Sequence, residues 1–150
     1  MVIRSYYKSN RELWRIVEIE FLHIADAVEA INGKLYMLGG CWTLHRSSNF
    51  PSNLRIGIAL SILMSPEELE ASTTHCLNLG IFGPHGSLIP EVPMQFAIDS
   101  RPASAEIPRR SIIALNTAVP IPAAGAYHVR VRVGDLERSV KFEAILSLQH

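Results

Sequence analysis

The residues of this chain best suited to chemistry are its histidines, cysteines and serines, and their spacing matches no common site. The six histidines occur at positions 23, 45, 75, 85, 128 and 150, without the short His/Cys spacings of a zinc site. The serines lack the glycine-flanked turn of a hydrolase nucleophile. Cys76 follows His75, but neighbouring residues of a strand point to opposite faces, so we do not expect a catalytic pair there. We therefore assign no catalytic residue, no cofactor and no metal ligand from the sequence.

Length, charge and cysteine content narrow the class of protein. A chain of 150 residues predicts one domain, and fourteen basic residues balance fourteen acidic ones. A net charge of zero gives no overall attraction to nucleic acid or to an anionic membrane. The apolar stretch from Ile16 to Ile24 is interrupted by charged residues, which is not typical of a signal peptide, and no run is long enough to span a membrane. Two cysteines, Cys41 and Cys76, are too few for a disulfide framework, so we expect two small buried side chains in a reducing compartment, the cytoplasm.

The elements that must position any site are predicted to be strands. Residues 1–17 read as an N-terminal extension, either flexible or a short helix from Arg11 to Val17, and residues 18–150 read as the β domain. The clearest alternation runs from Leu54 to Leu63, where every second residue is large and aliphatic. Further strands are expected at 19–27, 34–44 with a break at Gly39-Gly40, 75–82, 92–98, 110–116, 127–133 and 140–144. This pattern predicts an all-β, two-sheet antiparallel sandwich of about eight strands, immunoglobulin-like in style.

The stretch around Asn32-Gly33 has two interpretations. A two-residue type I′ turn would pair Ala30 with Leu35 and Val28 with Met37 on the core face. Alternatively, the spacing of Asp26 and Glu29 favours a capped helical turn before a strand at 34–38. Both leave a break at Gly39-Gly40, where the chain can change sheet and deliver Trp42 either to the core or to its rim.

Several local signals set the limits of the other elements. Ile19, Phe21 and His23 are predicted to share one face of the first strand, with Glu20, Leu22 and Ile24 on the other. Pro93 predicts an edge strand, and Pro120 and Pro122 predict the end of the strand that begins near Arg110. Tyr127 resembles the tyrosine corner of immunoglobulin-like domains, and Gly134-Asp135 predicts a hairpin turn. A helical turn from Ser65 and a linker from Ser100 to Pro108 complete the pattern.

Three sequence elements together carry a resemblance. They are F-L-H-I-A-D-A, N-G-K-L-Y-M-L-G-G-C-W and F-P, followed by P-x-x-G-x-Y before a V-x-V-x-V-G hairpin. Over roughly Glu20 to Ile145 the chain resembles a family of small uncharacterised bacterial proteins, a domain of unknown function. The resemblance implies a β-sandwich-like fold and supplies no activity and no functional residue.

Two groups of residues are candidates for contact with a protein partner. The first is an aromatic and basic group before and within one loop, and the second is a basic stripe on the last hairpin. Their members are Trp42, His45, Arg46 and Phe50 in the first group, and Arg130 and Arg132 in the second. We therefore expect a non-enzymatic binding or structural module that engages a protein partner. The alternative is a small enzyme or ligand-binding sandwich with a site assembled from separate loops, which would show a pocket of convergent polar groups.

Overall fold

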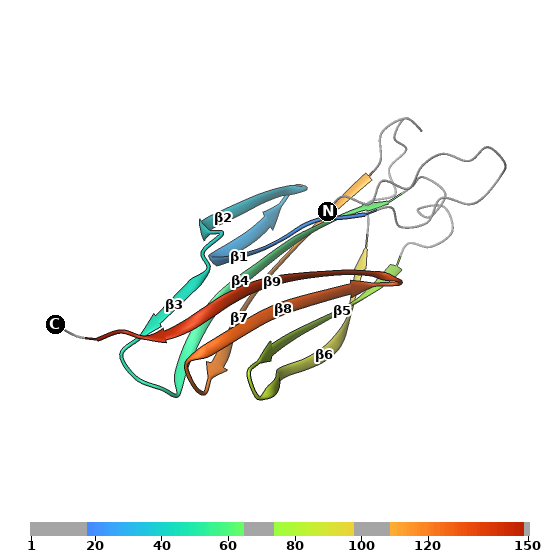
Figure 1. Ribbon diagram of the computed structural model, residues 1–150. Coiled ribbons are helices and arrows are strands. Elements are labelled where there is room, and N and C mark those ends of the chain that lie inside the picture. Colours follow the sequence, from blue (N-terminus) through green and yellow to red (C-terminus); the bar gives the residue numbers. More distant parts are fainter. Residues whose placement is uncertain (1–17, 65–73, 98–108, 149–150) are drawn as a thin grey trace.

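The computed structural model describes residues 18–64, 74–97 and 109–148, and these form strands and turns without any helix (Figure 1). The predicted N-terminal extension, the helical turn from Ser65 and the Ser100 to Pro108 linker lie outside the described residues. The strands are β1 (Glu18–Ile31), β2 (Lys34–Gly40), β3 (Leu44–Ser47), β4 (Ser52–Met64), β5 (Thr74–Gly83), β6 (Gly86–Ala97), β7 (Arg109–Ile121), β8 (Gly125–Val133) and β9 (Leu136–Leu146).

The strands form two layers, as the alternation predicted. One sheet has four strands in the order β2-β1-β4-β7, and the other has five in the order β3-β9-β8-β5-β6. The all-β class and the two sheets are confirmed. Within the described residues every pairing is antiparallel except that of β3 with β9, which is parallel, so only this edge departs from the expected antiparallel arrangement. None of the described residues forms a helix long and apolar enough to cross a membrane.

The main core lies between the two sheets and follows the predicted faces of β4 and β8. The aliphatic residues at alternate positions of β4 are all buried, and Leu60 is only 1% exposed. On the core face of the five-stranded sheet, Tyr127 of β8 stacks on its cross-strand partner Phe142 of β9 with ring centroids 5.5 Å apart. The Tyr127 hydroxyl donates to the Ala123 carbonyl at 2.6 Å, which confirms the predicted tyrosine corner.

The first strand corrects a predicted face. A bulge between Ile19 and Phe21 shifts the register of β1 against β4, so Ile19 joins Leu22 and Ile24 in the core instead of facing away from them. The carbonyls of Ile19 and Glu20 at this bulge accept hydrogen bonds from Arg138 of β9 at 2.7 and 3.0 Å. The bulge therefore joins β1 to the opposite sheet.

Proline positions were interpreted correctly in β6 and only in part in β7. Pro93 lies in β6, which is an edge strand as predicted. β7 does not stop before Pro120, which pairs opposite Asn53, but it does end at Ile121, directly before Pro122. β7 is also at the edge of its sheet, where a proline can be tolerated because one side of the strand has no ladder partner.

Candidate functional site

A tight hairpin connects β1 and β2. Asn32 and Gly33 both have positive φ, 51° and 71°, as a type I′ turn requires. Ala30 pairs with Leu35 and Val28 with Met37, so the predicted register is confirmed and the helical alternative is excluded.

This hairpin leaves its sheet and lies over the sheet's outer face. β1 stops pairing with β4 at Ala25 opposite Gly57, but it continues to pair with β2 as far as Ile31. A Cβ on Gly57 would lie 3.0 Å from the Val28 nitrogen, so glycine lets the backbone of β1 pass closely here, and a larger residue would push it away by a few tenths of an ångström. We call residues 26–40 the hairpin arm.

A side chain from the far edge of the sheet holds the hairpin arm. The Asn116 side-chain amide of β7 accepts from the Val28 N–H at 3.0 Å and donates to the Val28 carbonyl at 2.8 Å. Ala25, Val28 and Ala59 form a small second cluster beneath the hairpin arm. The predicted core face of the hairpin is therefore wrong in two respects: Val28 packs outside the main core, and Ala30 and Met37 are exposed.

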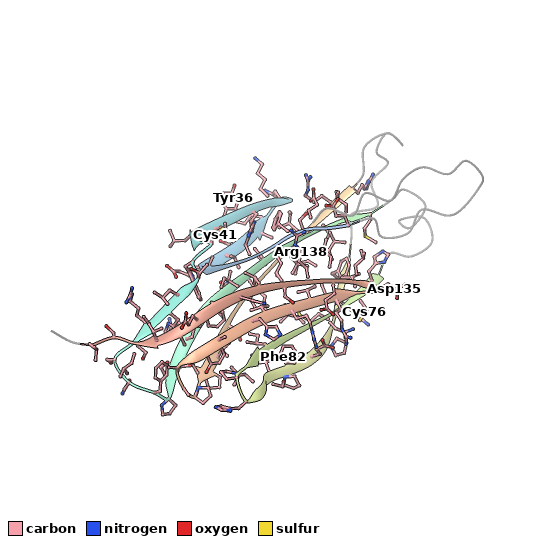
Figure 2. The ribbon with its side chains drawn as sticks, in the orientation of Figure 1. Tyr36, Cys41, Cys76, Phe82, Asp135 and Arg138 are labelled. Carbon is pink, nitrogen blue, oxygen red and sulfur yellow. The ribbon has the colours of Figure 1, made fainter. Side chains whose placement is uncertain are left out.

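The other face of the hairpin arm is open to solvent and carries two large apolar side chains of β2. Tyr36 is 53% exposed and Leu38 is 72% exposed, and Figure 2 shows Tyr36 on β2 at the margin of the molecule. Ile31 is exposed on the same face, and Met37 is exposed on the face that it shares with Val28. These four residues of the hairpin arm make up half of the eight large exposed hydrophobic residues among those described. Within the described residues β2 pairs only with β1, so its other backbone edge has no strand partner.

The chain changes sheet immediately after β2. Strand pairing ends at Gly40 rather than continuing through Cys41 as predicted, and Cys41 has a positive φ of 62°. The Cys41 N–H donates to the Ile24 carbonyl at 2.8 Å, and the Thr43 carbonyl accepts from Glu143 of the other sheet at 2.9 Å. Residues 41–43 therefore form the bridge between the two sheets.

Trp42 lies in this bridge, at the rim of the core. Its ring meets Phe142 edge-on with centroids 5.4 Å apart. The indole is half-buried, and its Nε1 is buried without a hydrogen-bond partner. An unpaired buried donor costs free energy, which makes this atom a candidate for contact with a ligand.

A cavity of about 420 Å³ opens beside Trp42, and we call it the rim pocket. Three of the six predicted contact residues, Trp42, His45 and Arg46, line it. The His45 Nε2 lies 3.3 Å from the Ser52 Oγ, and burial lowers the pKa of His45. The pocket thus combines one cation with one carboxylate and a histidine that is neutral at neutral pH. The full lining is Asp26, Gly39, Gly40, Trp42, Leu44, His45, Arg46 and Leu54.

Phe50, predicted as a loop anchor, is half-buried and packs against the core outside the pocket lining.

The two arginines predicted as a basic stripe lie elsewhere, on β8. Arg130 and Arg132 both pair with the carboxylate of Glu91, with Arg130 at 2.7 Å. Loss of hydration opposes ionisation of Glu91, but the hydrogen bonds from the two arginines hold its pKa below the ordinary value. Arg130 also lies 4.4 Å over the Phe82 ring. Neither arginine lines the rim pocket.

One pair of chemically active residues was not found from the sequence. The Cys41 Sγ lies 3.7 Å from the His23 Nδ1, and both residues reach the solvent. They are far apart in the chain, so no short motif contains them. The register of the β1–β2 hairpin could have revealed this pair. Because Ala25 pairs with Gly40, the next residue, Cys41, lies close to the residues that precede Ala25 on β1. No group of three or more His, Cys, Asp or Glu residues suited to a metal occurs in the described part of the chain.

Comparison with known proteins identifies a family, but one to which no activity is assigned. No curated protein is significantly similar to the chain. One family model, described as a family of unknown function, matches residues 20–143. This agrees with the resemblance to an uncharacterised domain noted in the sequence. Because the match covers most of its length, the chain belongs to the family of unknown function DUF6941.

Proposed function

We propose that this domain is a non-enzymatic binding module that docks an extended segment of a protein partner along β2. The observation that carries the proposal is the concentration of exposed apolar residues on a strand whose outer edge is unpaired within the described residues. Contiguous exposed apolar surface marks interaction sites. Open strand edges bind extended chains by main-chain hydrogen bonds.

The turn type specifies which backbone groups are available. In a two-residue hairpin the residues flanking the turn, Ile31 and Lys34, form a hydrogen-bonded pair, and such pairs then alternate along the ladder. Tyr36 and Leu38 therefore bond to β1. Leu35 and Met37 direct their N–H and carbonyl groups away from it. A partner strand would pair with these two residues.

The side chains indicate the chemistry of the partner segment. Tyr36 and Leu38 lie on the exposed face of β2, so an added strand would place alternate apolar side chains against them. The rim pocket lies at the end of the same strand and includes Gly39 and Gly40. Trp42, His45 and Arg46 would then contact the part of the segment that passes beyond β2.

The setting of this module is also part of the proposal. We infer a cytoplasmic location, supported by the two free cysteines. An immunoglobulin-like style of sandwich is supported by the tyrosine corner at Tyr127. A bacterial source is supported by the resemblance alone.

The test uses the full chain to select from a displayed library of random linear peptides. Wild type is expected to enrich segments with alternating apolar residues. Met37→Ala keeps the outward N–H and should retain most binding, whereas Met37→Pro removes that donor and should abolish it. Tyr36→Pro serves as the control for hairpin damage, because it removes an N–H that bonds to β1. Hydrogen exchange should show an intact hairpin in Met37→Pro and a disrupted one in Tyr36→Pro.

Two outcomes would overturn the proposal. Selected peptides that bind Met37→Pro as well as wild type would place the docking surface elsewhere. Sedimentation that shows a wild-type dimer and a Met37→Pro monomer would make the occupant of the edge a second copy of this chain.

A second candidate function is the binding of a small ligand in the rim pocket, favoured by the unpartnered Trp42 Nε1. The chain has two tryptophans, so a Trp14→Phe background leaves Trp42 as the only indole reporter. A panel of small carboxylates and amino acids should then change Trp42 fluorescence in a saturable way, and Arg46→Ala should weaken the effect. No saturable change with any member of the panel would exclude this candidate for those ligand classes.

A further inference from the structure

The two cysteines are both free, and the expectation that they are buried is wrong, because both are exposed; their surroundings differ. The Cys41 Sγ lies 3.7 Å from a ring nitrogen of His23, which can accept a proton. The Cys76 Sγ contacts the carbonyl of the adjacent Leu77 at 3.8 Å, and a carbonyl cannot take up the thiol proton. Figure 2 shows the two cysteines well apart in the molecule, so the chain carries its own comparison between a paired and an unpaired thiol.

The backbone holds Cys41 against His23. The Cys41 N–H donates to the carbonyl of Ile24, the residue that follows His23. Cys41 also has a positive φ of 62°, a conformation that is uncommon for residues with a side chain. On the other side, the His23 ring stacks on Phe21 with centroids 5.0 Å apart and planes 15° from parallel. Both partners of the pair are thus positioned by the fold.

We propose that Cys41 is a site of covalent modification by low-molecular-weight disulfides, with His23 as the proton acceptor. The thiolate is the nucleophile in thiol–disulfide exchange, and a neighbouring histidine favours it by taking the proton. In the reaction, His23 Nδ1 accepts the Sγ proton and the Cys41 sulfur attacks one sulfur of the small disulfide. A new S–S bond forms, the old one breaks, and the released thiolate takes the proton back from the imidazolium. One protein thiol and one disulfide give one mixed disulfide and one free small thiol.

This site is independent of the proposed docking edge. Cys41 follows the last residue of β2, and the reaction requires only Cys41, His23 and the small disulfide. It uses neither the outward backbone groups of Leu35 and Met37 nor the rim pocket.

The experiment measures the rate of mixed-disulfide formation with oxidised glutathione at neutral pH, by intact and peptide mass spectrometry. Cys76→Ser leaves Cys41 as the only thiol, and Cys41→Ser leaves Cys76. We expect Cys41 to react about tenfold faster than Cys76. His23→Gln in the Cys76→Ser background should reduce the rate to that of Cys76, and the same change in the Cys41→Ser background should have no effect.

Two controls separate the proton acceptor from simple accessibility. His23→Phe retains the stacking on Phe21 and removes the ring nitrogen, so it should slow Cys41 as much as His23→Gln does. In denaturant both cysteines of the wild type should react at equal rates. Equal rates for the two thiols in the folded protein would overturn the proposal. A fast Cys41 that is unaffected by both His23 variants would also overturn it, because exposure alone would then explain the rate.

Discussion

The hairpins β1–β2 and β8–β9 have the same local construction and opposite surroundings. Each has a two-residue turn that includes a glycine with positive φ, Gly33 at 71° and Gly134 at 58°. Each keeps continuous antiparallel pairing next to its turn. Yet Val131 of β8 is completely buried, whereas Leu38 of β2 is 72% exposed.

The difference lies in what covers each strand. β8 lies between β9 and β5, and its inner face packs against the opposite sheet. β2 is an edge strand, and the hairpin arm lies over the outer face of its own sheet. There Val28 packs in a small apolar cluster, whereas Tyr36 is exposed to solvent. Turn chemistry and alternation therefore predict that a hairpin forms, but not which layer its faces meet.

The largest effect should come from placing the same charge on both hairpins. Val131→Asp buries a carboxylate without a partner and should cost several kcal/mol, about 2–7, so that the protein no longer unfolds cooperatively. Leu38→Asp puts the same group in solvent and should leave the melting temperature within a few degrees of wild type. Circular dichroism melts would measure both, and equal losses of stability would contradict the comparison.

A smaller effect should follow from releasing the hairpin arm. Asn116→Ala leaves the N–H and carbonyl of Val28 without their side-chain partner and should cost about 1–3 kcal/mol. The loss should be local, with faster hydrogen exchange at Val28 and little change at Val131. Asn53→Ala, at an exposed position on β4, is the matched control. Unchanged exchange at Val28 would show that the hairpin arm is held by other contacts.

The tyrosine corner should contribute less. Tyr127→Phe removes the hydroxyl that bonds to Ala123 and should cost about 0.5–1.5 kcal/mol in urea unfolding. Tyr36→Phe on the exposed hairpin should cost almost nothing, because that hydroxyl is in solvent. A loss at Tyr36 as large as that at Tyr127 would mean that the two hairpins do not differ in the way described.

The smallest effect concerns acid stability near the start of β1, at the end of the strand remote from the hairpin arm. A hydrogen bond from Arg110 at 2.7 Å, with another from Ser61, holds the pKa of Glu20 below its ordinary value of 4.5. A carboxyl group whose pKa is lower in the folded state than in the unfolded state stabilises the fold at pH values above its unfolded-state pKa. This contribution is lost as the pH falls through the pKa of the folded state. Because Arg110 is half-exposed, the contribution should be at most about 1 kcal/mol. Glu20→Gln should flatten the pH dependence of the melting temperature below about pH 5, and an unchanged slope would contradict this assignment.

Sequence reasoning succeeded where an element is specified by its own residues. The faces of β4 and β8 follow from strict alternation, and the tyrosine corner follows from a pattern only a few residues long. Trp42, His45 and Arg46 were grouped as possible partner contacts because they are close in the chain, and the structure brings all three to the rim pocket. Their contact with a partner stays a prediction. Arg130 and Arg132 were chosen for their charge, but their partner Glu91 lies on another strand and could not be identified.

The features that were missed depend on contacts between distant residues. Asn116 binds Val28 across β4, and Cys41 meets His23 only after the hairpin has formed. The break at Gly39-Gly40 indicated a change of sheet, but not that β3 would run parallel to β9. Such pairings are decided by the packing of whole layers, which single-strand patterns do not contain.

The parallel pairing of β3 with β9 has a consequence for the order of events during synthesis. Leu44 pairs opposite Glu143, so β3 leaves the ribosome long before its neighbour has been translated. Until β9 has been synthesised, nothing joins β3 to β8 in the five-stranded sheet, and Trp42 lacks its ring contact with Phe142. Non-local pairings of this kind slow folding and leave nascent surface open to aggregation. A nascent chain stalled before β9 should therefore depend on chaperone protection much more strongly than one stalled after it.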